Sequence, residues 1–174
     1  MSDDERPGDP LAAARALPRG SMVVLRARDG ERLLRLATAL LKIARRNAVA
    51  LLIAGDPPLA ARLGADGIHL GEARAGETAY WRARFPTLLI TTAAHSPRAV
   101  WRARLFGADA VFLSPVFATP SHPARAPLTP ARANLIARGA GLPVYALGGI
   151  DARNAVLLAP GAYAGIAAIG ALRA

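Results

Sequence analysis

Short apolar runs alternate with helical patterns along almost the whole chain, and this alternation restricts the fold more than any other feature. Seven runs are predicted as strands, at residues 22–27, 48–54, 66–70, 87–93, 109–114, 142–149 and 163–172. Helical patterns separate them, at residues 30–47, 59–64, 77–85, 96–108, 129–140 and 151–160. Repeated strand–helix units with apolar strands predict a parallel sheet covered by helices.

Residues at the ends of the helical patterns agree with this assignment. Gly64 is placed to end the helix at 59–64, because glycine readily adopts the left-handed conformation of a C-terminal cap. Ser96 is a predicted N-cap with Pro97 at the first helical position, and Asp151 is a predicted N-cap of the helix at 151–160.

Two architectures share this pattern, an open doubly wound sheet and a closed barrel. No G-x-G-x-x-G segment follows the first predicted strand, which disfavours a dinucleotide-binding sheet. Against a barrel stands the length of 174 residues, since a complete (β/α)8 barrel typically has about 250 residues. The periodicity alone leaves the choice open.

Composition excludes several classes of protein. The chain is 53% hydrophobic and is expected to form one domain over residues 1–174. It has no apolar run long enough to span a membrane, and its acidic start is no secretory signal. It contains no cysteine, which excludes disulfides and fits a cytoplasmic protein. The net charge of +10 comes from arginines scattered along the chain, which argues against a nucleic-acid-binding surface.

Polar and glycine residues gather after the predicted strands, where ligands bind in parallel α/β proteins. Arg26 and Arg28 lie two residues apart on one strand face and suit phosphate oxygens. A Gly-Gly pair before a predicted helix can offer backbone N–H groups to a phosphate. The pattern therefore indicates a ligand with a phosphate or diphosphate group. The residues it singles out are Arg26, Arg28, Asp56, Asp66, His69, His95, Thr119, Ser121, His122, Gly148, Gly149 and Gly170.

Each of these features also has a purely structural interpretation. Asp56 and Asp66 can share a hard cation such as Mg²⁺, but Asp56 also suits the cap of a short helix and Asp66 the start of a strand. The glycine pair is equally a tight turn. His95 fits a buried structural histidine and His122 an exposed loop residue. The residues alone leave both interpretations open.

Three segments carry a resemblance to a known family: "LGADGIHLGE" at 63–72, "TAAHSPRAVWRARLFGADAVFLSPVFATPSHP" at 92–123 and "LPVYALGGIDARNAVLLAPGAYAGIAAIGAL" at 142–172. In order and spacing they resemble the thiamine phosphate synthase and TenI family, from about residue 4 onward. The G-A-D-G-hydrophobic-H-L-G segment and the S-P-V-F-x-T-P loop are the specific parts of the match. The resemblance implies a TIM (β/α)8 barrel.

The resemblance also implies a reaction and its residues. Members of the family join hydroxymethylpyrimidine diphosphate to a thiazole phosphate, with Mg²⁺ assisting the release of diphosphate. By position, Asp56 and Asp66 match the metal-associated aspartates. The residues implied in catalysis are Arg26, Arg28, Thr119, Ser121 and His122, and those implied in phosphate binding are Gly148, Gly149 and Gly170.

The chain departs from the family pattern at several site positions. Val24 and Arg28 replace the glutamine and lysine of the Q-x-R-x-K strand, and Gly55 and Ala93 replace an asparagine and a serine. His122 replaces the last lysine of the T-x-T-K loop. Loss of that charge at neutral pH removes a charge-assisted hydrogen bond worth roughly 1.5–3 kcal/mol. Pyrimidine recognition is therefore less well supported than a phosphate site.

Three functions are consistent with these observations. The leading one is thiamine phosphate synthesis, and the second is a TenI-like thiazole phosphate tautomerase, although Pro115 stands where that branch has a histidine. The third is a barrel that binds a phosphorylated ligand without catalysis. Small phosphorylated molecules are the expected partners, and related barrels lead us to expect a homo-oligomer.

The family pattern begins with a strand and closes with a helix that this chain, as written, lacks. Met1, Ser2 and Asp3 stand where that first strand should end, and Ala174 directly follows the last predicted strand. A barrel without these elements would have open edges at 22–27 and 163–172. We expect a start site further upstream, with completion by a partner as the alternative.

Overall fold

Seven strands form a single parallel sheet in the computed structural model, which describes residues 9–119 and 126–168. Every strand that the sequence predicts is present, which confirms the alternating pattern. The strands are β1 (Met22–Leu25), β2 (Ala50–Ala54), β3 (Gly67–Leu70), β4 (Leu89–Ala94), β5 (Ala110–Leu113), β6 (Val144–Leu147) and β7 (Gly165–Ala167).

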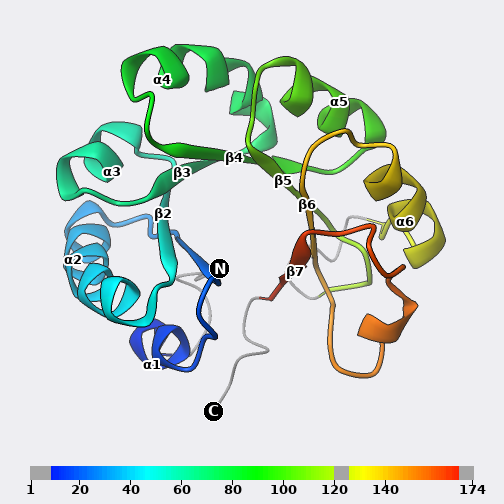
Figure 1. The fold of residues 1–174 in the computed structure, drawn as a ribbon, viewed down its shortest axis with the longest axis horizontal. Coiled ribbons are helices and arrows are strands. Elements are labelled where there is room, and N and C mark those ends of the chain that lie inside the picture. Colours follow the sequence, from blue (N-terminus) through cyan, green and yellow to red (C-terminus); the bar gives the residue numbers. More distant parts are fainter. Residues whose placement is uncertain (1–8, 120–125, 169–174) are drawn as a thin grey trace.

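Helical segments connect the strands and cover the outside of the sheet (Figure 1). Ser96 caps the helix at Pro97–Leu105 by accepting a hydrogen bond from the Ala99 N–H at 3.1 Å, and Gly64 ends the helix at Pro57–Leu63 with a φ of 66°, both as predicted. The segments are α1 (Pro10–Arg15), α2 (Gly30–Asn47), α3 (Pro57–Leu63), η1 (Glu72–Glu77), α4 (Thr78–Arg84), α5 (Pro97–Leu105), α6 (Pro130–Arg138) and η2 (Ala155–Leu157).

Strand order settles the architecture that periodicity left open. Each strand pairs with the next one along the chain, from β1 to β7, whereas the strand order of a doubly wound sheet reverses at a switch point. The sheet curls so that its strands surround an interior, and the helices form the outer layer (Figure 1). The fold is therefore of the TIM-barrel type. Within the described residues, β1 pairs with β2 and β7 with β6, with no ladder joining β1 to β7.

Alternate side chains of the strands pack into two separate layers. Residues such as Leu51, Ile53 and Ile68 point outward and are fully buried beneath the helices. Val24 and Phe112 belong instead to a smaller apolar cluster inside the curled sheet. This separation follows from the period of two along a strand, and it places the inward-facing residues beneath the loops at the carboxyl end of the sheet.

Two segments differ from the sequence prediction. A helix at Pro10–Arg15 was not predicted; Asp9 caps it by accepting a hydrogen bond from the Leu11 N–H, and it packs on α2. The helix predicted at 151–160 is wrong, since only the 3-10 turn η2 forms there. The Asp151 carboxylate accepts hydrogen bonds from the N–H groups of Arg153 and Asn154, and such local bonds compete with helix formation.

In the described part of the chain, no helix is both long enough and apolar enough to cross a membrane.

Candidate functional site

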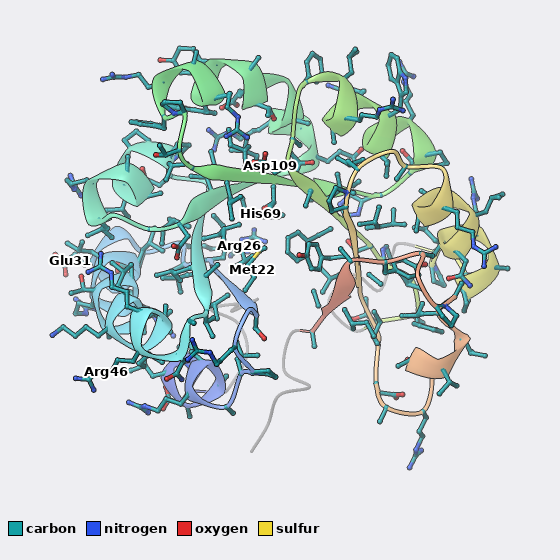
Figure 2. The ribbon with its side chains drawn as sticks, viewed as in Figure 1. Met22, Arg26, Glu31, Arg46, His69 and Asp109 are labelled. Atoms are coloured by element: carbon teal, nitrogen blue, oxygen red, sulfur yellow. The ribbon has the colours of Figure 1, made fainter. Side chains whose placement is uncertain are left out.

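The carboxyl ends of the parallel strands lie at one edge of the sheet and bring several predicted residues together. Arg26 and Arg28 directly follow β1, Asp56 follows β2, and Gly148 follows β6. Both arginines are exposed there, as expected for residues that meet a ligand. Figure 2 shows Arg26 extending into the space enclosed by the curled sheet, near His69 of β3. The structure therefore supports one shared site at this edge.

His69 lies on the inner face of the sheet, where it is buried and uncharged. The Thr91 hydroxyl donates to the carbonyl of Ile68 at 3.2 Å, so its oxygen accepts from the Nδ1–H of His69 at 3.0 Å. Phe112 meets the imidazole edge-on at 5.2 Å between ring centroids. Burial, with a smaller contribution from the charge of Arg26, lowers the pKa of His69 to about 4. At neutral pH the imidazole is a neutral group beneath a cationic site.

Asp56 caps a short helix, which was one of the two roles considered for it beside metal binding. Its Oδ1 accepts a hydrogen bond from the Leu59 N–H at 2.9 Å and caps α3, with Pro57 at the first helical position. Its position at the carboxyl end also places it among the site residues. Beside it, Arg74 of η1 donates from Nη1 to the carbonyl oxygen of Gly55 at 2.9 Å. Asp56 therefore stabilises the local structure and adds a negative charge to the site.

Asp66 does not share a site with Asp56, because the two residues lie at opposite ends of β2 and β3. Asp66 precedes β3, and its Oδ2 accepts a hydrogen bond from the N–H of Leu51, near the start of β2, at 2.8 Å. The prediction that these two carboxylates share a metal ion is wrong on this geometry. Within the described ranges, no group of three or more His, Cys, Asp or Glu residues is arranged to hold a metal ion.

The sequence contains a signal that identifies the structural role of Asp66. The tripeptide Gly-Ala-Asp occurs at 64–66 and again at 107–109. Asp109 repeats the geometry: its Oδ2 accepts from the N–H of Ile90 in β4 at 2.6 Å, as Asp66 does from Leu51. In both repeats the glycine has a positive φ and ends the preceding helical segment. Asp66 thus belongs to a repeated connection at the amino end of the sheet.

The loop after β5, residues 114–119, packs directly on the glycine pair after β6. A Cβ on Gly148 would lie 2.8 Å from the Cα of Pro115, and one on Gly149 would lie 2.3 Å from the carbonyl oxygen of Ala118. Both glycines also have positive φ values, 97° and 65°. Close packing and backbone conformation therefore require glycine at both positions. The glycine pair therefore forms a tight turn, which was one of its two interpretations. The pair also packs against the loop that ends at Thr119.

His95 forms a second polar cluster at the carboxyl end, with Glu72 and Ser114. Its Nδ1 lies 2.6 Å from the carbonyl oxygen of Ser114, which can only accept, so Nδ1 carries the proton. Its backbone N–H donates to Glu72 Oε2 at 2.8 Å. In the neutral imidazole, Nε2 is consequently the proton acceptor. The cluster links the loops after β3, β4 and β5, and the structural interpretation of His95 accounts for these bonds.

Three predicted site residues, Ser121, His122 and Gly170, lie outside the described residues. Sequence reasoning missed Arg74, which follows β3. The only available signal for Arg74 was its spacing of three residues from Glu77, which places the two on one side of a helical turn. It also missed Tyr145, whose ring stacks on Phe112 inside the sheet.

The chain matches a family model described as thiamine monophosphate synthase over residues 4–172. It is 39% identical to a thiamine-phosphate synthase of Thermus thermophilus over 158 residues, 86% of this chain and 76% of the relative. It is 29% identical to a thiamine-phosphate synthase of Bacillus velezensis over 99% of this chain and 80% of the relative. A thiamine phosphate pyrophosphorylase from Pyrococcus furiosus has the same fold, with a TM-score of 0.81 at 23% identity, over 97% of this chain and 82% of that structure.

Proposed function

The chain belongs to the thiamine monophosphate synthase family, and on that premise we propose that it catalyses the synthase reaction of thiamine biosynthesis. The observation that carries the proposal is its 39% identity, over most of its length, to a protein named thiamine-phosphate synthase. The site supports it, because Arg26, Arg28 and the loop at 114–119 lie at the edge where ligands bind in this fold.

The reaction forms one bond and breaks one. The bond between the pyrimidine methylene carbon and the diphosphate oxygen breaks, and its electron pair leaves with the diphosphate. The thiazole nitrogen then donates its lone pair to that carbon, which gives thiamine phosphate and free diphosphate. Negative charge grows on the leaving group, so fixed positive charge placed near it lowers the barrier.

The residues of this chain are assigned roles by their position. Arg26 and Arg28 bind diphosphate oxygens, since both are exposed at the end of β1 and carry a permanent charge. Thr119 binds in the same region, followed in the loop by Ser121 and His122. The phosphate of the thiazole substrate is assigned to Gly148 and Gly149, and to Gly170. The inner apolar cluster, which contains Phe112, excludes water beneath the reacting carbon.

The resemblance implies Mg²⁺ as a cofactor, which would assist the release of diphosphate when bound. The described residues contribute Asp56 as a carboxylate at the relevant edge, and they do not form a metal site by themselves. We therefore assign no step to the ion. As a single-domain cytoplasmic enzyme, the protein would act on small phosphorylated substrates, and light scattering on the purified chain would measure the expected self-association.

A direct assay tests the proposal. The purified chain is incubated with hydroxymethylpyrimidine diphosphate, thiazole phosphate and Mg²⁺, and thiamine phosphate is followed by chromatography. Arg26→Gln should lower the turnover at least about tenfold, because it removes a charge-assisted contact. Arg46→Gln, which removes an exposed arginine from the last turn of α2, should leave turnover unchanged. A folded chain that forms no thiamine phosphate would refute the synthase proposal.

A second candidate, thiazole phosphate tautomerisation, is favoured by one observation. His95 is held with Nδ1 protonated, which leaves Nε2 of the neutral ring able to accept a proton at the carboxyl end of the sheet. In D₂O, a tautomerase would exchange deuterium into thiazole phosphate in the presence of EDTA, and His95→Gln would abolish the exchange. If thiazole phosphate raises the thermal midpoint of the chain but neither activity is found, the remaining function is a barrel that binds a phosphorylated ligand without catalysis.

A further inference from the structure

Arg74 is held rigidly at the carboxyl end of the sheet by groups on two different loops. Its Nε donates to Glu77 Oε1 at 2.8 Å and its Nη2 to Glu77 Oε2 at 2.7 Å, which is a two-point ion pair. Trp81 donates from Nε1 to the same Glu77 Oε2 at 2.9 Å. The hydrogen bonds from Arg74 and Trp81 lower the pKa of Glu77 to about 2. Glu77 is therefore ionised at neutral pH and fixes the guanidinium.

The guanidinium lies at the end of β2, beside the carboxylate that the resemblance implies for a metal. Its Nη1 donates to the carbonyl oxygen of Gly55 at 2.9 Å, and Asp56 is the next residue. The hydrogen bond from Glu77 raises the pKa of Arg74, and the charge of Asp56 adds to that effect. Arg74 and Asp56 thus interact electrostatically, so a fixed cationic group stands beside this carboxylate.

A divalent cation fits this arrangement poorly. Proteins hold Mg²⁺ through one or two carboxylates, and waters and substrate phosphates complete its near-octahedral shell. The carbonyl of Gly55 already accepts from Arg74, and Oδ1 of Asp56 already accepts from the N–H of Leu59. Asp66, the second carboxylate that was expected to bind metal, lies at the opposite end of β3. An ion beside Asp56 would also be repelled by the fixed guanidinium.

An anion fits the same place well. A guanidinium has five N–H donors, and the three bonds to Glu77 and Gly55 use three of them, which leaves two. The Arg74 side chain is 37% exposed, so a ligand can reach it. Arginine is well suited to binding phosphate oxygens through such donors.

We propose that Arg74 takes the place of a divalent cation at the end of β2, so that its guanidinium binds the diphosphate group directly and the free protein binds Mg²⁺ only weakly. The identity of the anion rests on the proposed synthase function. The weak binding of metal and the dependence of diphosphate binding on Arg74 do not, because both can be measured on the free protein.

Binding measurements on the full chain test this proposal without any turnover. Inorganic diphosphate is titrated by calorimetry in buffer with EDTA, and in separate metal-free protein Mn²⁺ is titrated and followed by electron paramagnetic resonance. Arg74→Gln should weaken diphosphate binding by about tenfold to a hundredfold, and Arg74→Lys by less, because it keeps the charge. Arg74→Gln should also tighten Mn²⁺ binding, and the added change Asp56→Asn should abolish that gain.

Arg35→Gln is the matched control. Arg35 also pairs with a glutamate, Glu31, but it lies on the exposed face of α2 and should leave both titrations unchanged. The thermal midpoint of each variant confirms that it is folded, since an exposed ion pair contributes little stability. Equal diphosphate affinity in Arg74→Gln and the wild type would overturn the proposal, as would tight Mn²⁺ binding to the wild type that depends on Asp56.

The proposed synthase function and the proposed role of Arg74 can be refuted separately. Diphosphate binding that depends on Arg74 in a chain that makes no thiamine phosphate would refute the synthase function and keep the anion site. Thiamine phosphate formation with diphosphate binding that ignores Arg74 would keep the function and refute the role of Arg74.

Discussion

The two ends of the sheet use the same residue types for different purposes. At the amino end, Asp66 and Asp109 each accept a hydrogen bond from a backbone N–H of the preceding strand, so their carboxylates fix strand against strand. At the carboxyl end, Asp56 caps a helix beside Arg74, whose side chain is 37% exposed. The position of a carboxylate along the strand therefore decides whether it fixes one strand against another or lies at the candidate site, although the residue type is the same.

The two ends of the sheet can also be compared through two uncharged residues, Gly67 and Gly149, which pack closely against backbone. A Cβ on Gly67, at the start of β3, would lie 2.3 Å from the carbonyl oxygen of Leu89 in β4. A Cβ on Gly149 would lie at the same 2.3 Å from the carbonyl oxygen of Ala118. The first contact lies inside the ladder between β3 and β4, whereas the second joins two loops. Equal clashes at the two ends should therefore have unequal consequences.

The largest effect is expected from Gly67→Ala. The paired strands β3 and β4 cannot separate without losing their ladder, so we expect the free energy of unfolding to fall by about 3 kcal/mol or more. Gly149→Ala should cost about 1–2 kcal/mol, because its clash is with loop backbone outside any strand ladder, and should raise the KM for thiazole phosphate. Urea denaturation and steady-state kinetics give both values, and equal losses of stability would contradict the distinction between the two ends.

His69 lies inside the sheet between its two ends, and its contribution to stability should depend on pH. Burial holds the pKa of His69 near 4, below its unfolded value of about 6.5, so the unfolded chain binds a proton more readily than the folded chain. Stability from this residue is complete above pH 6.5 and is lost as the pH falls toward 4, by roughly 3 kcal/mol at most. Denaturant midpoints measured over this range should fall less steeply for His69→Gln, and an identical slope would show that other groups cause the loss.

A smaller effect is expected from the carboxylates at the amino end. Asp109→Ala removes the partner of the Ile90 N–H and of Arg82, and we expect it to reduce the free energy of unfolding by about 2 kcal/mol. Asp66→Ala should cost about 1 kcal/mol by losing the bond to Leu51. Below its unfolding temperature each variant should keep the turnover of the wild type. If the Asp66→Ala variant is stably folded but loses turnover, Asp66 has a role in the active site and not only a structural one.

The smallest change in stability is expected from a matched pair of helix caps. Asp9 and Asp56 both cap a helix that has proline at its first position, and asparagine caps about as well as aspartate. Asp9→Asn and Asp56→Asn should each change the free energy of unfolding by less than about 0.5 kcal/mol. Only Asp56→Asn should tighten the binding of inorganic diphosphate, because only Asp56 places a negative charge beside the anion site. Equal diphosphate affinity in the two variants would remove Asp56 from the site.

The sequence by itself determined the strands, most helices and the edge of the sheet at which the candidate site residues gather. Apolar runs with β-branched residues separated by helical periods predict these elements, because both patterns depend on local geometry and on burial. Ser96 and Gly64 were identified as caps for the same reason, since a cap acts within a few residues. The family resemblance rests on long spaced motifs, and comparison with known relatives confirms it.

The tertiary structure decided what depends on contacts between distant residues. Asp56 and Asp66 are ten positions apart in the chain, and only the strands between them show that they lie at opposite ends of the sheet. The bond from Arg74 to Gly55 spans nineteen positions and leaves no periodic trace in the sequence. The failed helix at 151–160 has a related cause, because the bonds of Asp151 and Asn154 outweighed an intrinsic helical preference. Local chemistry is encoded locally, whereas the distribution of charge over the site requires the fold.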